Sequence, residues 1–267
     1  MNRLYQSNSF SIAYDIAGIG TPVVLLHGFG EDATIFQHQK DFLKGKCKLI
    51  ALNLPGTGNS IVDYSTANAT VEYLAEVVNE LLNHLEIEKC ILLGHSMGGY
   101  ITLAFAELFP DKLMSFGLIH STAFADCEEK KINRLKGIDI MKEYGAAAFL
   151  KTTFPNLFSN EFKKTQHPLL ETLISQFSYI TTDACVYYYQ AMIARTDKTN
   201  LLRTAAVPVL FVIGEEDIAA PMADVLQQAY LPAVSYVHIL KNVGHMSMVE
   251  APEKLNAILE EFILFSK

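Results

Sequence analysis

Cysteine and basic residues are both scarce in this 267-residue chain. Its four cysteines lie far apart and include no C-x-x-C pair, which argues against a zinc site or a redox dithiol and favours reduced thiols. Lys and Arg number 21 against 29 Asp and Glu, so the net charge is −8, and no basic cluster is longer than the pair Lys130-Lys131. Because nucleic acids are bound through clustered basic side chains, we expect no nucleic-acid partner.

Long hydrophobic runs are missing as well. No stretch approaches the roughly 18 apolar residues that crossing a bilayer requires. The first residues, MNRLYQSNSFSIAYD, lack the apolar segment and small-residue cleavage site of a secretory signal. We therefore expect a cytoplasmic protein without a membrane span. Half of the residues are hydrophobic, which is enough for a large buried core, and nothing in the sequence specifies an oligomeric state.

Short apolar runs alternate with longer amphipathic stretches along most of the chain. Apolar runs bounded by turn residues predict strands at FSIAYDIAG, PVVLLHG, CKLIALNLP, CILLGHS, SFGLIHS, VPVLFVIGEED and SYVHILKN. All but the first lack clean alternation, which is typical of strands buried on both faces. VEYLAEVVNELLNHLE and APEKLNAILEEFILF have helical spacing. The order predicts an α/β fold, with a mostly parallel twisted sheet and helices on both faces.

The interval from about 124 to 202 breaks this alternation. It contains helical stretches near 130–144, 169–177 and 183–194 but no convincing strand. Because its flanks return to strand-like segments, we expect a single domain over 1–267 with a helical cap inserted at about 124–202. Most of the cap's many aromatic residues should pack in its own core, with one or two reaching a pocket.

The stretch GHSMGG carries the clearest chemical signal. Gly94-x-Ser96-x-Gly98 follows a predicted strand and precedes MGGYITLAFAELF, which is helical in pattern. A strand that turns abruptly into a helix would hold Ser96 on a strained turn, and the flanking glycines would let the backbone close around it. The amide of Met97, at the helix start, would be placed to donate to a developing oxyanion.

A serine hydroxyl is a weak nucleophile that needs a general base, and the base needs a group that orients it. Two later strands end in suitable residues, VLFVIGEED in Asp217 and VHILKNVGH in His245. The order Ser96, Asp217, His245 is the order expected for a nucleophile on a strand–turn–helix elbow.

Together these motifs resemble the α/β-hydrolase fold family, in its serine-nucleophile branch of esterases and lactonases. The resemblance runs through VVLLHGFG, ALNLPGTGNS, LLGHSMGGYITLAFA, PVLFVIGEEDIAAP and NVGHMSMVEAPE, which cover nearly the whole chain outside the cap. It implies Ser96 as nucleophile, His245 as general acid and base, and Asp217 as the group that fixes the imidazole tautomer.

The resemblance also bears on residues around these motifs. In this family the residue after the first His-Gly provides an oxyanion-hole amide, which here implies Phe29 beside Met97. Many relatives carry aspartate where this chain has Asn53, in a turn with a structural role, and that change leaves the triad intact. We interpret His27 and His95, which flank the motifs, as structural residues.

A substrate pocket should lie at the rim where these strands end. The candidates for it are His120 at the end of SFGLIH, Phe154 of the cap, and Met246 beside the predicted base. For His120 two roles stay open: its side chain lines the pocket, or it merely fills space there.

The serine nucleophile favours hydrolysis of a small-molecule carboxylic ester, thioester or lactone through an acyl-enzyme, with neither a metal nor an organic cofactor. Haloalkane dehalogenases and most epoxide hydrolases of this fold use aspartate at the elbow. Two alternatives stay open: hydrolysis of a carbon–carbon bond in a diketone-type substrate, and a hydrolase-like ligand receptor with slow or no turnover. Gly28-x-Gly30-x-x-Ala33 suggests a dinucleotide-binding oxidoreductase, but that class predicts an acidic residue where Asn53 stands.

Overall fold

The computed structural model describes residues 3–266 and contains one large sheet. Its nine strands within this range follow the order β1-β2-β4-β3-β6-β7-β8-β9, with β5 paired to β2 outside that row. Neighbours from β4 to β9 are parallel, whereas β2 is antiparallel to β1, β4 and β5. The strands are β1 Arg3–Gln6, β2 Phe10–Ala17, β3 Pro22–Leu26, β4 Lys48–Leu52, β5 Ile61–Val62, β6 Cys90–His95, β7 Leu113–Ile119, β8 Val209–Gly214 and β9 Ser235–Leu240.

Helices form nearly all of the connections between the parallel strands. The α-helices are α1 Gln37–Leu43, α2 Val71–His84, α3 Met97–Leu108, α4 Glu128–Tyr144, α5 Ala146–Thr153, α6 Asn160–Thr165, α7 His167–Phe177, α8 Thr182–Ala194, α9 Thr199–Thr204, α10 Met222–Ala229, α11 Ser247–Glu250 and α12 Pro252–Phe265. Three short 3₁₀ segments, η1 Ala33–Phe36, η2 Pro110–Lys112 and η3 Phe154–Leu157, complete the secondary structure of residues 3–266. None of these helices is both long and apolar enough to cross a membrane.

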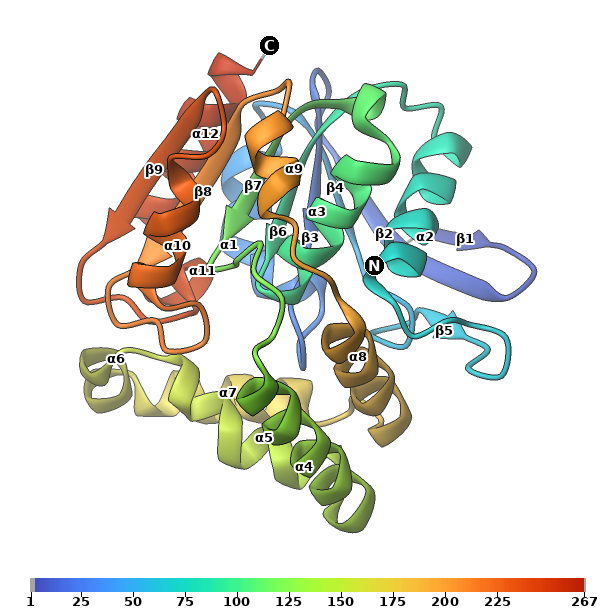
Figure 1. Cartoon of the computed structure of the whole chain (residues 1–267), viewed down its shortest axis with the longest axis vertical. Coiled ribbons are helices and arrows are strands. Elements are labelled where there is room, and N and C mark those ends of the chain that lie inside the picture. Colours follow the sequence, from blue (N-terminus) through green and yellow to red (C-terminus); the bar gives the residue numbers. More distant parts are fainter. Residues whose placement is uncertain (1–2, 267) are drawn as a thin grey trace.

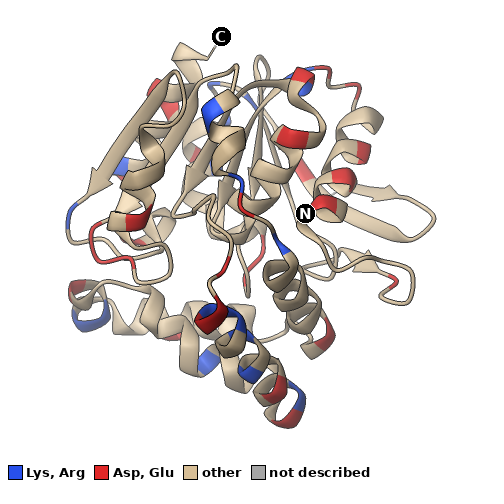
Figure 2. Cartoon of the chain, in the orientation of Figure 1, with Lys and Arg blue, Asp and Glu red and all other residues tan. Residues whose placement is uncertain are grey.

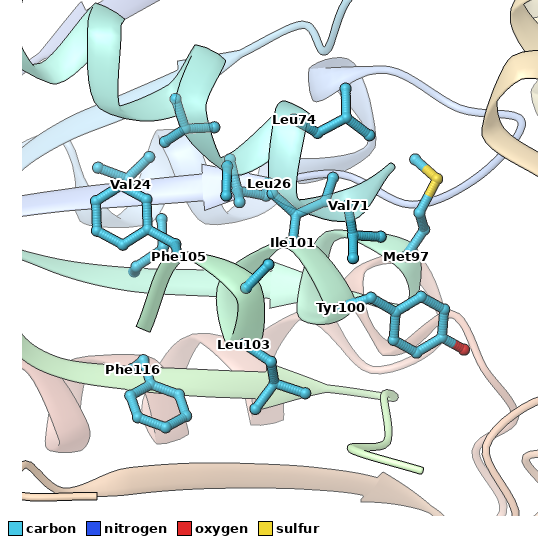
Figure 3. Packing of buried hydrophobic residues seen from close by; sticks show 14 of the residues in the cluster. Val24, Leu26, Val71, Leu74, Met97, Tyr100, Ile101, Leu103, Phe105 and Phe116 are labelled. Atoms are coloured by element: carbon cyan, nitrogen blue, oxygen red, sulfur yellow. The ribbon is translucent and has the colours of Figure 1, made fainter. Parts of the chain in front are cut away.

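Successive side chains of the central strands enter opposite hydrophobic layers. Val24 and Leu26 of β3 belong to the layer with α2, α3, α9 and α10, whereas Val23 and Leu25 belong to the layer with α1, α11 and α12. Figure 3 shows the first layer, where Leu26 lies close to Ile101 of α3. The continuous apolar character of the central strands follows from this burial on both faces, and the predicted α/β architecture is confirmed.

The ends of the sheet differ from the sequence-based expectation. Strand β9 was expected to be buried on both faces, but it is an edge strand with Val237 and Ile239 exposed. Strands β1 and β5 were not predicted, because four and two residues give too little pattern to recognise. Helix α1, with the sequence QHQKDFL, was missed for the same reason: it is short and mostly polar.

Within the described residues, the segment between β7 and β8 contains helices joined by loops and no strand. Helices α4 to α8 gather at one end of the sheet (Figure 1). Helix α9 instead packs against α3, in the layer of helices that covers one face of the sheet. We propose that the chain forms a single domain with a cap at about 124–202, and that the cap proper ends with α8.

Candidate active site

Ser96 lies on a tight turn between β6 and α3. Its φ is 50°, a left-handed conformation that residues other than glycine rarely adopt. A side chain at Gly94 would collide with the backbone of Gly98, and one at Gly98 would collide with the carbonyl oxygen of Leu26. Glycine is therefore required at both positions. The strained turn holds Ser96 just beyond the carboxyl end of β6.

Asp217 follows β8 and is buried beside the same end of the sheet. Its Oδ1 accepts hydrogen bonds from the amides of Ala219 and Ala220, each at 2.9 Å. Its Oδ2 lies 2.8 Å from Nδ1 of His245 and 3.1 Å from Nδ1 of His120. Burial raises the pKa of Asp217, but the two imidazoles outweigh burial and hold the pKa well below its usual range. Asp217 is thus an ionised carboxylate shared by two histidines.

His120 does not line the cavity above Ser96, although it was a candidate for the pocket. Its side chain is fully buried, and both ring nitrogens are engaged: Nδ1 faces Asp217, and Nε2 lies 2.7 Å from Oγ of Ser247. Burial lowers the pKa of His120 to about 4, so the ring is neutral near pH 7. A neutral imidazole that donates from Nδ1 to the carboxylate accepts at Nε2 from the serine hydroxyl.

His120, Asp217 and His245 also form the one group of metal-ligand type found among residues 3–266. Both imidazoles meet a single carboxylate oxygen at hydrogen-bonding distances. We therefore interpret the group as a hydrogen-bond network centred on Asp217.

Ser96 and His245 both line one cavity of about 170 Å³, which the cap covers. Phe154 of η3 and Met246 line the same cavity, as the sequence suggested. No hydrogen bond joins the Ser96 hydroxyl to the His245 ring within the described residues. Such a bond is often completed only when substrate is bound.

The loop after β3 passes directly beside Ser96. A side chain built on Gly28 would come within 3.2 Å of the Ser96 Cβ, so the peptide that joins Gly28 to Phe29 lies next to the serine. The N–H groups of Phe29 and Met97 find no acceptor within residues 3–266. Two unpaired amides flanking a hydroxyl are the arrangement that binds an oxyanion.

Glu31 and His95 form a buried pair behind this loop. Oε1 of Glu31 lies 2.5 Å from Nδ1 of His95 and accepts from the amide of Gly28 at the same distance. Nε2 of His95 lies 3.0 Å from the carbonyl oxygen of His245. Burial lowers the pKa of His95, but the charge and hydrogen bond of Glu31 outweigh burial and raise it. Since both ring nitrogens face acceptors, His95 carries both protons and ties the loop to the backbone of His245.

Sequence reasoning missed Glu31, and its one signal was an acidic residue immediately after the HGFG stretch. His27 has the structural role that we expected: its Nε2 accepts from the amide of Leu54 at 3.0 Å, and burial lowers its pKa. Asn53 holds the neighbouring segment, because its Oδ1 accepts from the amide of Ala33 at 3.1 Å. Both residues fix the loops around the site without reaching the cavity.

A family model described as alpha/beta hydrolase fold matches residues 21–252. The chain therefore belongs to the α/β-hydrolase fold family. It is 31% identical over 247 residues to the dihydrolipoyllysine-residue acetyltransferase component of the acetoin cleaving system of Pseudomonas putida, a match that covers 91% of this chain and 64% of that relative.

Two further similarities cover most of both chains. The 3-oxoadipate enol-lactonase 1 of Acinetobacter baylyi is 24% identical over 242 residues, or 90% of this chain and 88% of that protein. The solved structure of a thermophilic esterase from Thermogutta terrifontis, bound to malate, superposes with a TM-score of 0.93 at 26% identity, covering 99% of each chain.

Proposed function

We propose that this protein is a serine hydrolase that cleaves a small carboxylic ester or lactone through an acyl-enzyme. The observation that carries the proposal is the position of Ser96 on a strained turn, in one cavity with a histidine whose Nδ1 lies 2.8 Å from the buried Asp217. This is the nucleophile, base and orienting group of a catalytic triad.

The reaction begins when Nε2 of His245 takes the hydroxyl proton of Ser96 as its oxygen attacks the substrate carbonyl. The amides of Phe29 and Met97 hold the oxyanion that forms, which is worth about 3 to 4 kcal/mol per donor in comparable sites. His245 then gives the proton to the leaving alcohol. Water, deprotonated by the same imidazole, attacks the acyl group and releases the acid and the free serine.

The size of the cavity and the similar proteins support a small ester or lactone. A cavity near 170 Å³ is comparable in volume to sites that hold one small ring, which favours a short acyl group. An esterase and an enol-lactonase stand among the proteins to which this chain is similar.

Turnover assays test the proposal. Wild-type protein should hydrolyse p-nitrophenyl acetate or a γ-lactone, and Ser96→Ala should lower kcat by about a thousandfold or more. Ser178→Ala, on an exposed part of the cap, is the matched control and should retain wild-type rates. Retained turnover in Ser96→Ala contradicts the proposal.

The same assays separate the alternatives. Cleavage of a vinylogous diketone without turnover of any ester or lactone would identify a carbon–carbon bond hydrolase. Binding of esters without turnover would identify a receptor.

A further inference from the structure

Arg134 of the cap helix α4 lines the same cavity as Ser96. Its Nε donates to Oδ2 of Asp126 at 2.6 Å, and its guanidinium lies 5.1 Å from the ring centroid of Tyr189, which also lines the cavity. Helix α4 carries side chains of both charges (Figure 2), but Arg134 is the residue of this helix that reaches the cavity.

The charges around Arg134 do not cancel. Oδ1 of Asp126 accepts from Nη2 of Arg195 at 2.8 Å, so two guanidiniums share one carboxylate and one positive charge is left over among these three side chains. Glu31 is the one acidic residue among the described residues that line the cavity, and it is paired with His95. The cap side of the cavity therefore favours an anion.

Arg134 also retains donors for a ligand. A guanidinium has five N–H groups. Asp126 takes the Nε–H and the Tyr189 hydroxyl interacts with another, while the remaining N–H groups have no acceptor within residues 3–266. The hydrogen bond to Asp126 fixes the plane of the Arg134 guanidinium, so its remaining N–H donors are already oriented. Planar, oriented N–H pairs match the two oxygens of a carboxylate.

Building on the proposed serine hydrolase function, we propose that Arg134 binds a free carboxylate on the substrate. The substrate class is then a small ester or lactone that carries a carboxylate, and the product acid or alcohol keeps that group. The small cavity limits the distance between the carboxylate and the scissile carbonyl to a few carbon atoms.

Matched substrates that differ only in charge test this proposal. Monoethyl succinate and ethyl succinamate compare a carboxylate with a carboxamide on the acyl side. Acetoxyacetic acid and acetoxyacetamide make the same comparison on the alcohol side. In at least one pair, wild-type kcat/KM should be about 10 to 100 times higher for the carboxylate. A ratio near one in both pairs overturns the proposal.

Variants assign the preference to Arg134. Arg134→Gln should reduce the carboxylate-to-carboxamide ratio of kcat/KM by about 10- to 100-fold. Arg134→Lys should reduce this ratio less, because lysine keeps the positive charge but lacks the planar pair of N–H donors. Lys136→Gln removes one charge from an exposed position of the same helix and should leave the ratio unchanged. An equal loss on both members of a pair means a merely structural role for Arg134 and contradicts the proposal.

Two further measurements keep the result decisive. Succinate should inhibit wild-type hydrolysis of p-nitrophenyl acetate more strongly than succinamide, and this comparison needs no variant, even if Arg134→Gln fails to fold. Hydrolysis of neutral esters that depends on Ser96, without any carboxylate preference, would overturn this inference alone. The absence of any turnover dependent on Ser96 would overturn the proposed function itself.

Discussion

Among single residues, Asp217 has the most hydrogen-bond partners in the site. Two backbone amides hold one carboxylate oxygen, and the imidazoles of His245 and His120 share the other. A carboxylate with this many donors stays ionised although it is buried. Its negative charge is therefore available to stabilise the imidazolium that forms when His245 accepts a proton.

His120 makes the stability of the folded protein depend on pH. Its folded pKa of about 4 lies below the usual 6.5, so the unfolded chain binds a proton first as the pH falls. Stability is lost progressively between these two values, by about 3 kcal/mol in total from this residue, and no further below them. His120→Asn removes the titration, and asparagine tolerates the φ of 51° at this position.

Urea unfolding at pH 7 and pH 4.5 measures this effect. The wild type should lose more stability between the two pH values than His120→Asn, and His38→Asn, at an exposed histidine, should behave like the wild type. Identical pH dependence in all three proteins would show that His120 does not titrate in this way.

The proposed catalytic residues could be selected from the sequence because each follows a strand in a recognisable motif. Ser96 lies between glycines, and Asp217 and His245 follow apolar runs in the expected order. The second partner of Asp217 could not be predicted, because a histidine at the end of a neighbouring strand carries no sign of which way it faces. Arg134 gave no signal either, since it is one of many charged residues on a mostly polar helix.

At the scale of secondary-structure elements, the turn between β6 and α3 positions Ser96, the proposed nucleophile. The first turn of α3 packs against the end of β3, where a side chain on Gly98 would meet backbone oxygens of Leu26 and His27. Backbone cannot move aside as a flexible side chain can. The serine is therefore held by a close approach of two elements that only glycine permits.

Gly98→Ala should destabilise the protein by about 3 kcal/mol and reduce ester turnover, because the strand and the helix must separate to admit the methyl group. Gly45→Ala is the control, since no atom lies within 4 Å of the position that its methyl group would take. Thermal unfolding and kcat measured on both variants check this prediction. Equal stability of the two variants would mean that the elbow has room for a side chain.

The central strands could be predicted because burial on both faces leaves continuous apolar runs. The edges of the sheet could not, since β9 is apolar in sequence but has only one strand neighbour and no covering on part of its surface. Edge position is a property of the assembled sheet, and a single strand does not encode it.

At the scale of the whole molecule, the cap is joined to the loop that carries His245. The amide of His245 donates to the carbonyl of Leu157 at 2.7 Å. Glu250 of α11 accepts from the amide of Ser159 in the cap at 2.9 Å, and from those of Gly244 and Met246 at 3.1 Å each. One carboxylate thus fixes the cap and the histidine loop relative to each other.

Glu250→Gln should lower kcat/KM about tenfold and stability by about 1 to 3 kcal/mol, because the new amide group places donors against backbone N–H groups. Amide hydrogen exchange should become faster in residues 241–250, which a general loss of stability would not confine to this loop. Glu253→Gln, at an exposed position, is the control. Full activity with unchanged exchange in Glu250→Gln would contradict this role.

The helices of the segment that we propose as the cap could be recognised in the sequence, but their contacts with the core could not. Leu157 is the last residue of the short segment η3 and Ser159 immediately precedes α6, and so short a stretch has no periodic pattern to indicate which groups face the site. We expect substrate selectivity to depend on those contacts and on Arg134, so the sequence indicates the proposed chemistry better than the substrate.

The most direct test of the account is covalent labelling with a fluorophosphonate, followed by intact-mass measurement and peptide mapping. The wild type should gain a single phosphonyl group on Ser96, at a rate that falls when His245 is replaced by alanine. Ser96→Ala should gain none. Equal labelling of Ser96→Ala, or a label mapped to another residue of the wild type, would contradict the assignment of Ser96 as the nucleophile.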